Sequence, residues 1–307
     1  MIDTWLQPLP HGITLSCRAA GERGRPVLMF LHGFPEAAFV WDPLLEHFAR
    51  PENGGYRCVA PNLRGYEQSS APGDVAAYRA KHLVQDIAAL IAIEAQGRPL
   101  ACLVAHDWGG AVAWNLANQL PQLQHKLVII NSPHPGTFLR ELKSNPKQQA
   151  ASAYMNFLIR PDAETLLKED DYRRLWDFFL NMGAGQNANG TGYGWLTEEV
   201  KARYRAVWGR GLTGGLNYYR ASPLRPPRPD DPASASIELP REMLTIALPT
   251  LVLWGLGDTA LPPELIEGMD DYIPLLTLQR VPDATHWIVH EQPQLVITSL
   301  QAFLLQK

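Results

Sequence analysis

The sequence predicts an α/β protein: a mostly parallel central sheet with helices on its faces, interrupted by a helical cap. Short apolar runs alternate with segments of helical spacing at both ends of the chain. The middle of the chain instead has aromatic-rich helical segments and no short β-branched run. A wholly apolar run is typical of a strand covered on both faces, as in a parallel sheet. We therefore expect a core domain formed by residues 1–131 and 246–307, and a cap formed by residues 132–245.

The first part of the core alternates strands with helices. The segment 27–31 is entirely apolar, as a strand buried on both faces requires. Further along the chain, Leu83, Ile87 and Leu90 recur at helical spacing. The predicted strands are 13–19, 27–31, 57–60, 100–104 and 126–130, and the predicted helices are 41–49, 78–95 and 111–119. We expect 13–19 to be the opening strand of the sheet.

The cap and the return to the core follow a different pattern. The predicted cap helices lie at 150–159, 172–182 and 197–207. The segment from Gly183 to Gly194 predicts a mobile loop and not a dinucleotide-binding turn, because no strand precedes its glycines. The Pro- and Asp-rich segment 221–240 predicts an irregular connection. The core resumes with predicted strands at 250–254 and 275–281 and predicted helices near 263–270 and at 293–304.

The composition argues against several classes of function. A net charge of −4 without a long basic run argues against a nucleic-acid-binding protein. There is no stretch of about 20 apolar residues, so we expect no membrane span. The N-terminus lacks the pattern of a signal peptide, and Cys17, Cys58 and Cys102 are odd in number and widely spaced. We therefore expect free thiols and a cytoplasmic location. The histidines lack metal-ligand spacing, so we expect neither a metal nor a cofactor.

Asp107 lies at the apex of a predicted strand, sharp turn and helix. The turn Ala105-His106-Asp107-Trp108-Gly109-Gly110 follows the strand at 100–104 and precedes the helix at 111–119. Its small residues let the chain hold a strained apex residue over a helix N-terminus. An acid could serve there as a helix N-cap. Two polar residues further along the chain, Asp258 and His286, favour the role of a nucleophile instead. Ser is the usual residue at this position.

Asp258 and His286 also follow predicted strands. Asp258 comes after the strand at 250–254, and His286 comes after the strand at 275–281. In an open parallel sheet, sites form outside the carboxyl ends of the strands. The order nucleophile, acid, histidine is one of the chain orders known for catalytic triads. We therefore predict that Asp107, Asp258 and His286 meet at one edge of the sheet.

Four segments resemble the motifs of a known family. His32-Gly33-Phe34-Pro35 follows the predicted strand 27–31, and His106-Asp107-Trp108-Gly109-Gly110 carries the acid described above. In the cap, Tyr154 stands seven residues before Pro161, and Gly215-Leu216-Asn217-Tyr218-Tyr219-Arg220 contains further tyrosines. Together these segments resemble the α/β-hydrolase superfamily and, within it, the soluble epoxide hydrolases, over nearly the whole chain. At Ala105 a Gly is commoner in the family.

The resemblance implies an α/β-hydrolase fold and a role for each motif. It implies that the backbone N–H groups of Phe34 and Trp108 form an oxyanion hole. It also implies that Tyr154 and Tyr219 hold the epoxide oxygen and protonate it as the ring opens. The cap would then form a lid over an apolar pocket. The implied reaction adds water to a small apolar epoxide, gives a vicinal diol and needs no cofactor.

A carboxylate suits this reaction better than a hydroxyl. Attack by Ser on a saturated carbon would give an ether, which water does not readily cleave. Attack by Asp107 gives a hydroxyalkyl ester, which water can hydrolyse at the carboxyl carbon of Asp107 itself. We predict that His286 activates this water. Asp258 would hold His286 in the needed tautomer and stabilise its charged form.

The residues leave other functions open. A haloalkane or haloacid dehalogenase of the same fold would use Asp107 and His286 in the same way. It would replace the tyrosine pair with halide-binding N–H donors, of which Trp108 could be one. Ester cleavage and a non-catalytic receptor are further alternatives, and the aromatic-rich cap could support a homodimer. For His106 and Glu36 we expect structural roles.

Overall fold

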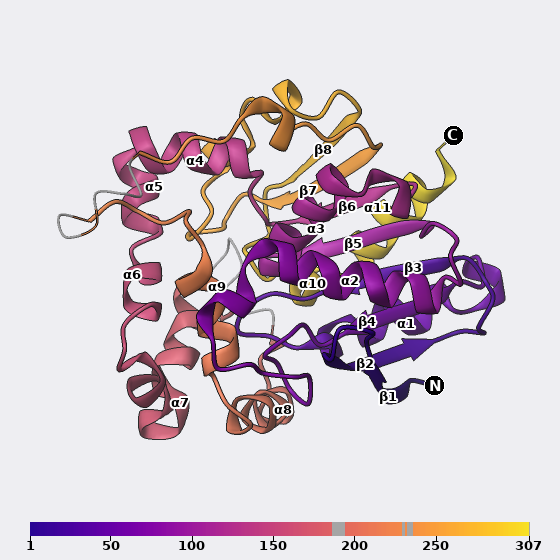
Figure 1. The fold of residues 1–307 in the computed structure, drawn as a ribbon, viewed down its shortest axis with the longest axis horizontal. Helices are drawn as coiled ribbons and strands as arrows, with labels where there is room; N and C mark the ends of the chain where they lie inside the picture. The colour runs from indigo at the N-terminus through magenta and orange to yellow at the C-terminus, as the bar shows by residue number, and fades with distance from the viewer. Residues whose placement is uncertain (186–193, 229–230, 232–235, 307) are drawn as a thin grey trace.

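The strands form one sheet in the order β1-β2-β4-β3-β5-β6-β7-β8 in this computed structural model, which describes residues 1–185, 194–228, 231 and 236–306 (Figure 1). The strands are β1 (Asp3–Pro8), β2 (Thr14–Ala20), β3 (Val27–Leu31), β4 (Arg57–Pro61), β5 (Cys102–His106), β6 (Leu127–Ile130), β7 (Thr250–Gly255) and β8 (Leu276–Val281). The pairs β1–β2 and β2–β4 are antiparallel, and all later neighbours are parallel. The mostly parallel sheet that the sequence predicts is confirmed.

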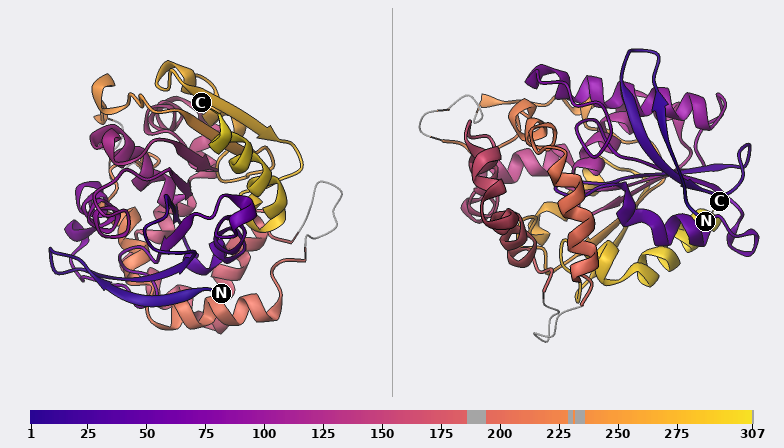
Figure 2. Two further views of the ribbon diagram at one scale, coloured as in Figure 1. Left: turned by 90° about the vertical axis from the view of Figure 1, so that its right-hand side faces the viewer. Right: turned by 90° about the horizontal axis from the view of Figure 1, so that it is seen from below.

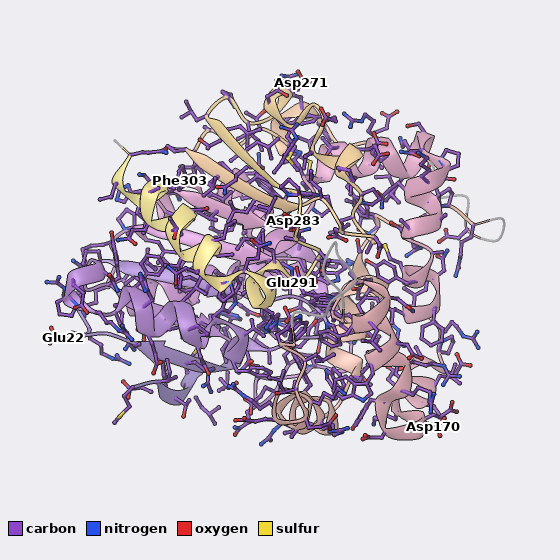
Figure 3. All side chains as sticks on the ribbon, turned by 180° about the vertical axis from the view of Figure 1, so that it is seen from behind. Glu22, Asp170, Asp271, Asp283, Glu291 and Phe303 are labelled. Carbon is purple, nitrogen blue, oxygen red and sulfur yellow. The ribbon has the colours of Figure 1, made fainter. Side chains whose placement is uncertain are left out.

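Helices cover both faces of this sheet. They are α1 (Asp42–Phe48), α2 (Ala80–Glu94), α3 (Trp108–Gln119), α10 (Ile288–Glu291) and α11 (Pro293–Leu305). Helix α2 packs beside α3, and α1 packs beside α11, on opposite sides of the strands (Figure 2, right). Every residue from β3 through β7 that belongs to a strand is therefore buried. This double cover explains why the sequence has wholly apolar runs instead of an alternating pattern.

The helices between β6 and β7 gather at one side of the molecule (Figure 1). They are α4 (Pro135–Ser144), α5 (Pro146–Ala151), α6 (Tyr154–Leu158), α7 (Ala163–Asn181), α8 (Glu198–Gly209) and α9 (Thr213–Ala221). Helix α9 packs on the core turn η3 (Val75–Tyr78). Gly65 and Gly214 approach so closely there that a Cβ on either would overlap the other's backbone. The close approach brings α9 against the core, and α6 packs beside α9.

Several elements differ from the expectation. The expected opening strand, 13–19, corresponds to the second strand of the sheet, because β1 precedes it. Strand β1 is mostly exposed, so it has no apolar run by which it could be predicted. The expected helix near 263–270 is wrong, because the chain forms the short 3-10 turns η7 (Pro263–Ile266) and η8 (Met269–Asp271) on either side of Gly268 at φ 76°. The expected helix 150–159 is divided between α5 and α6.

Two expected loops fall partly outside the described residues. Residues 186–193 of the segment from Gly183 to Gly194 lie outside the described residues. Residues 229–230 and 232–235 of the connection 221–240 do so as well. The three cysteines are free and buried, as the sequence predicts. Among the helices that the structure describes, none combines the length and the apolar character needed to cross a membrane.

Candidate active site

Asp107 occupies a strained turn between β5 and α3. Its backbone has φ 49° and ψ −122°, a conformation that residues with a side chain rarely adopt. Gly109 must lack a side chain, because a Cβ there would lie 2.5 Å from the carbonyl oxygen of Leu31. A Cβ on Gly110 would lie 2.3 Å from that of Ser132. The flanking glycines therefore let the turn sit directly on the neighbouring strand ends and lift the Asp107 carboxylate above the sheet.

The turn after β3 holds one oxygen of this carboxylate. The backbone N–H of Phe34 donates a hydrogen bond of 2.7 Å to Oδ1 of Asp107. His32 supports the turn, because its Nε2 accepts from the backbone N–H of Leu63 and its Nδ1 lies 2.9 Å from the carbonyl oxygen of Gly33. Burial lowers the pKa of His32 to about 4, so this ring stays neutral. Oδ1 of Asp107 therefore faces a fixed donor, as an oxyanion hole requires.

Asp258 and His286 follow β7 and β8, and the fold brings them together. Nδ1 of His286 lies 2.7 Å from Oδ2 of Asp258. The other donors to this carboxylate are the Asn131 side chain at 2.8 Å and the backbone N–H groups of Ala260 and Leu261 at 3.0 and 2.9 Å. Four hydrogen bonds thus hold a buried carboxylate in one orientation. They keep Asp258 aimed at His286.

His286 lies between the two acids. Its Nε2 is 3.7 Å from Oδ2 of Asp107, and the side chain is buried. Burial alone would lower the pKa of His286, but the negative charges of Asp258 and Asp107 outweigh it and raise this pKa to about 9. The free protein therefore carries a His286 cation between two carboxylates at neutral pH. Neutralising Asp107 would remove one of the charges that hold this proton.

Tyr154 and Tyr219 come from two different helices, α6 and α9. Both line the cavity that also contains Asp107, and their ring centres are 6.1 Å apart. Burial and the nearby charge of Asp107 both raise the pKa of each phenol above its usual value. Both hydroxyls therefore stay protonated at neutral pH and can donate hydrogen bonds. The pair that the sequence singles out shares one chamber with the acid.

The cavity beside Asp107 has a volume of about 300 Å³. It runs along α3, where Trp108, Ala111 and Val112 line it, and reaches the partly exposed Met243. Asp107 is the only charged side chain among the described residues that line it. Its size lies at the lower end of the range for small-molecule sites. The chamber therefore suits a small, mostly apolar compound with one polar centre near Asp107.

Sequence reasoning missed Asn131 and gave Glu36 and His106 no more than a structural role. Asn131 follows β6 at φ 39° and ties Asp258 to the neighbouring strand, because its Oδ1 accepts from the backbone N–H of Gly255. The sequence signal that could have identified Asn131 is its position as a polar residue directly after an apolar run. Glu36 is fully buried, with His106 Nδ1 at 3.2 Å and His290 Nε2 at 2.5 Å. Nothing local in the sequence marks this cluster.

Trp108, the other predicted oxyanion donor, is the first residue of α3. Its ring packs edge-on against Tyr219, with ring centres 5.0 Å apart. The predicted oxyanion hole requires a backbone N–H directly after Asp107, and Trp108 has that position. Within residues 1–185, 194–228, 231 and 236–306, no three His, Cys, Asp or Glu side chains are grouped in a way that could hold a metal ion.

Comparisons with known proteins cover almost the whole chain. The family described as alpha/beta hydrolase fold matches residues 26–293. The AB hydrolase superfamily protein YfhM of Bacillus subtilis is 34% identical over 93% of this chain and 92% of its own length. Epoxide hydrolase 4 of Mus musculus is 31% identical over 96% of this chain and 77% of its own length. A Bacillus megaterium epoxide hydrolase solved with an inhibitor is 29% identical, with a TM-score of 0.86, over 98% of this chain and 100% of that one.

Proposed function

This chain belongs to the α/β-hydrolase family and, within it, to the epoxide hydrolases, and from that premise we propose that it adds water to an epoxide to give a vicinal diol. One observation carries the proposal. The Asp107 carboxylate, placed between a backbone donor and His286, shares a mostly apolar chamber with the phenol groups of Tyr154 and Tyr219. That set supplies a nucleophile, a base and an acid without a cofactor.

In the first step, Oδ2 of Asp107 attacks a ring carbon of the epoxide and the carbon–oxygen bond breaks. Oδ1 stays on the N–H of Phe34, at 2.7 Å, and becomes the carbonyl oxygen of the new ester. The leaving oxygen develops negative charge and takes a proton from the tyrosine pair. The raised pKa of Tyr154 and of Tyr219 keeps both hydroxyls available for this donation.

In the second step, His286 takes a proton from water, which attacks the carboxyl carbon of Asp107. The bond between that carbon and Oδ2 then breaks, and the diol leaves with Oδ2 and with the proton that His286 returns to it. The oxyanion that forms on Oδ1 is stabilised by the N–H of Phe34 and, we propose, by that of Trp108. Ester formation removes the Asp107 charge, one of the charges that raise the pKa of His286. The proton that His286 releases then returns to the tyrosine that protonated the leaving oxygen, so His286 is neutral and can act as a base after the ring has opened.

The tyrosine pair favours an epoxide over a halogenated substrate. A halide leaves as a weakly basic anion and needs N–H donors, whereas an alkoxide is a strong base and needs an acid. Two phenols that line the cavity with Asp107 stay protonated and can supply this acid. Dehalogenation and ester cleavage remain the alternatives that the experiment below separates.

The test is a single turnover in water labelled with oxygen-18. Protein in excess is mixed with styrene oxide, and the peptides that contain Asp107 and Asp258 are weighed by mass spectrometry. We expect label in the Asp107 peptide, because water attacks its carboxyl carbon, and none in the Asp258 peptide, which serves as the internal control. Diol without label in Asp107 would contradict the ester intermediate. Halide release from a haloalkane, without diol formation, would identify a dehalogenase.

Two further parts of the proposal have indirect support. The three buried free thiols support a location in a reducing compartment such as the cytoplasm. The partners that the cavity favours are a small apolar epoxide and water, because its lining is mostly apolar. A homodimer stays a prediction, and its test is the mass of the protein in solution.

A further inference from the structure

Four aromatic rings form a closed cluster beside the catalytic carboxylate. Phe34 contacts Tyr219 and Phe178, with ring centres 5.2 and 5.9 Å apart. Tyr154 contacts the same two rings, at 6.1 and 5.2 Å. All four contacts are edge-on, which is the arrangement that aromatic rings prefer when packed tightly. Phe178, from α7, thus bridges the core residue Phe34 to the cap residue Tyr154.

Two of the four rings border the cavity. Tyr154 and Tyr219 line it, whereas Phe34 and Phe178 are not among the described residues that do. The next residue of α7, Phe179, is fully buried and stacks on Trp287, with ring centres 4.4 Å apart. The indole N–H of Trp287 donates to the carbonyl oxygen of Phe179, which fixes this part of α7 to the core.

We infer that this site takes terminal epoxides, which carry one apolar arm, and that Phe178 excludes epoxides substituted on both ring carbons. The inference rests on the proposed function and adds the substrate class to it. The substrate's single arm lies in the cavity along α3, toward Met243. The unsubstituted ring carbon faces the wall that Phe34 and Phe178 form.

The geometry of ring opening leads to this restriction. Asp107 must approach one ring carbon from the side opposite the oxygen, and the oxygen must point at Tyr154 and Tyr219. This fixes the line from carboxylate to tyrosines, so substituents on the two ring carbons of a trans epoxide project to opposite sides of that line. The cavity accepts one of them. The other meets the rings of Phe34 and Phe178, which contact each other and would have to move apart to admit an inserted group.

The experiment measures kcat/KM for three epoxides that differ only on the second ring carbon: styrene oxide, trans-β-methylstyrene oxide and trans-stilbene oxide. These place hydrogen, methyl and phenyl there. We expect kcat/KM to fall along the series, by about tenfold or more between the first and the last, since a misfitting group costs transition-state binding.

Two variants separate the wall from the intrinsic reactivity of the substrates. Phe178→Ala removes the wall, and Leu180→Ala removes an apolar side chain from the same helix that is 51% exposed. We expect Phe178→Ala to raise the ratio of kcat/KM for trans-stilbene oxide to that for styrene oxide by about tenfold, and Leu180→Ala to leave it unchanged. Phe178→Leu takes its place if the Ala variant does not fold.

The outcomes distinguish the inference from the proposed function. Similar kcat/KM for all three substrates in the native protein would overturn the inference, and so would an unchanged ratio in the Phe178 variants. Either result leaves epoxide hydrolysis standing, because diol still forms. If none of the three epoxides gives diol and Asp107 gains no label in a single turnover, the proposed function itself fails.

Discussion

The two oxygens of the Asp107 carboxylate have different surroundings, and this difference assigns them different tasks. Oδ1 accepts the N–H of Phe34 at 2.7 Å, whereas Oδ2 lies 3.7 Å from Nε2 of His286. A donor on Oδ1 stabilises negative charge that develops there during ester hydrolysis. Oδ2 has the looser contact and is the proposed attacking atom. The strained backbone at φ 49° is the local cost of presenting both oxygens at once.

We predict that Tyr219→Phe slows ring opening about 10- to 100-fold and leaves ester hydrolysis nearly unchanged, because the hydroxyl acts only on the leaving oxygen. Rapid-mixing measurement of ester formation and decay separates the two steps. Tyr218→Phe is the matched control, since its hydroxyl already donates to the carbonyl oxygen of Arg64 at 3.0 Å. Equal slowing of both steps, or an equal effect of the control, would mean that Tyr219 only packs.

Helix α8 of the cap contacts the turn after β3 that carries Phe34. Two residues one helical turn apart on α8 reach neighbouring residues of that turn. The Tyr204 hydroxyl donates to Oε1 of Glu36 at 2.9 Å, and the Trp208 indole N–H donates to the carbonyl oxygen of Pro35 at 2.7 Å. Pro35 follows Phe34 directly. The position of a cap helix therefore bears on the donor that faces Asp107.

We predict that Tyr204→Phe lowers the stability of the protein by about 1–3 kcal/mol, because Glu36 is a buried carboxylate that loses a donor. We also expect slower hydrolysis of the Asp107 ester, since the turn that carries Phe34 becomes less rigid. Thermal unfolding and ester decay in a single turnover measure the two effects.

The matched control for this helix is Tyr172→Phe. The ring of Tyr172 also packs on Trp208 of α8, with ring centres 5.3 Å apart, but Tyr172 belongs to α7. We expect this variant to keep the native rate of ester decay. If Tyr204→Phe and Tyr172→Phe behave alike, α8 contributes packing alone and does not act through the turn that carries Phe34.

The protein as a whole combines buried histidines with opposite pKa shifts. Burial lowers the pKa of His32 and His134 to about 4, so both contribute stability above the ordinary histidine pKa of 6.5 and lose it as the pH falls toward 4. His286 has its pKa raised to about 9 by Asp258 and Asp107, against the effect of burial. Its contribution is complete below pH 6.5 and is lost as the pH rises through 9.

We therefore predict that stability is highest near pH 6.5 and falls on both sides of it. Calorimetric melting between pH 4 and 9.5 measures the profile. In His286→Gln, the decrease between pH 6.5 and 9 should shrink by an amount on the order of a few kcal/mol in unfolding free energy, while the acid side keeps its shape. An unchanged alkaline side in this variant would show that the His286 charge is not coupled to folding.

The sequence by itself determined the kind of chemistry. Strand, turn and helix signals are local, so the apex position of Asp107 and the strand-end positions of Asp258 and His286 could be read from neighbouring residues. The parallel core followed from wholly apolar runs, because double burial leaves that trace. The exposed strand β1 left no such trace and was missed.

Only the tertiary structure decided how the site is supported and what it admits. Glu36 meets His290 across 254 residues of chain, and Asn131 meets Asp258 across 127. The wall formed by Phe34 and Phe178 joins the core to the cap in the same way. No local pattern encodes such contacts, because they depend on how separately formed elements pack together. The shape of the chamber is therefore a property of the packed molecule.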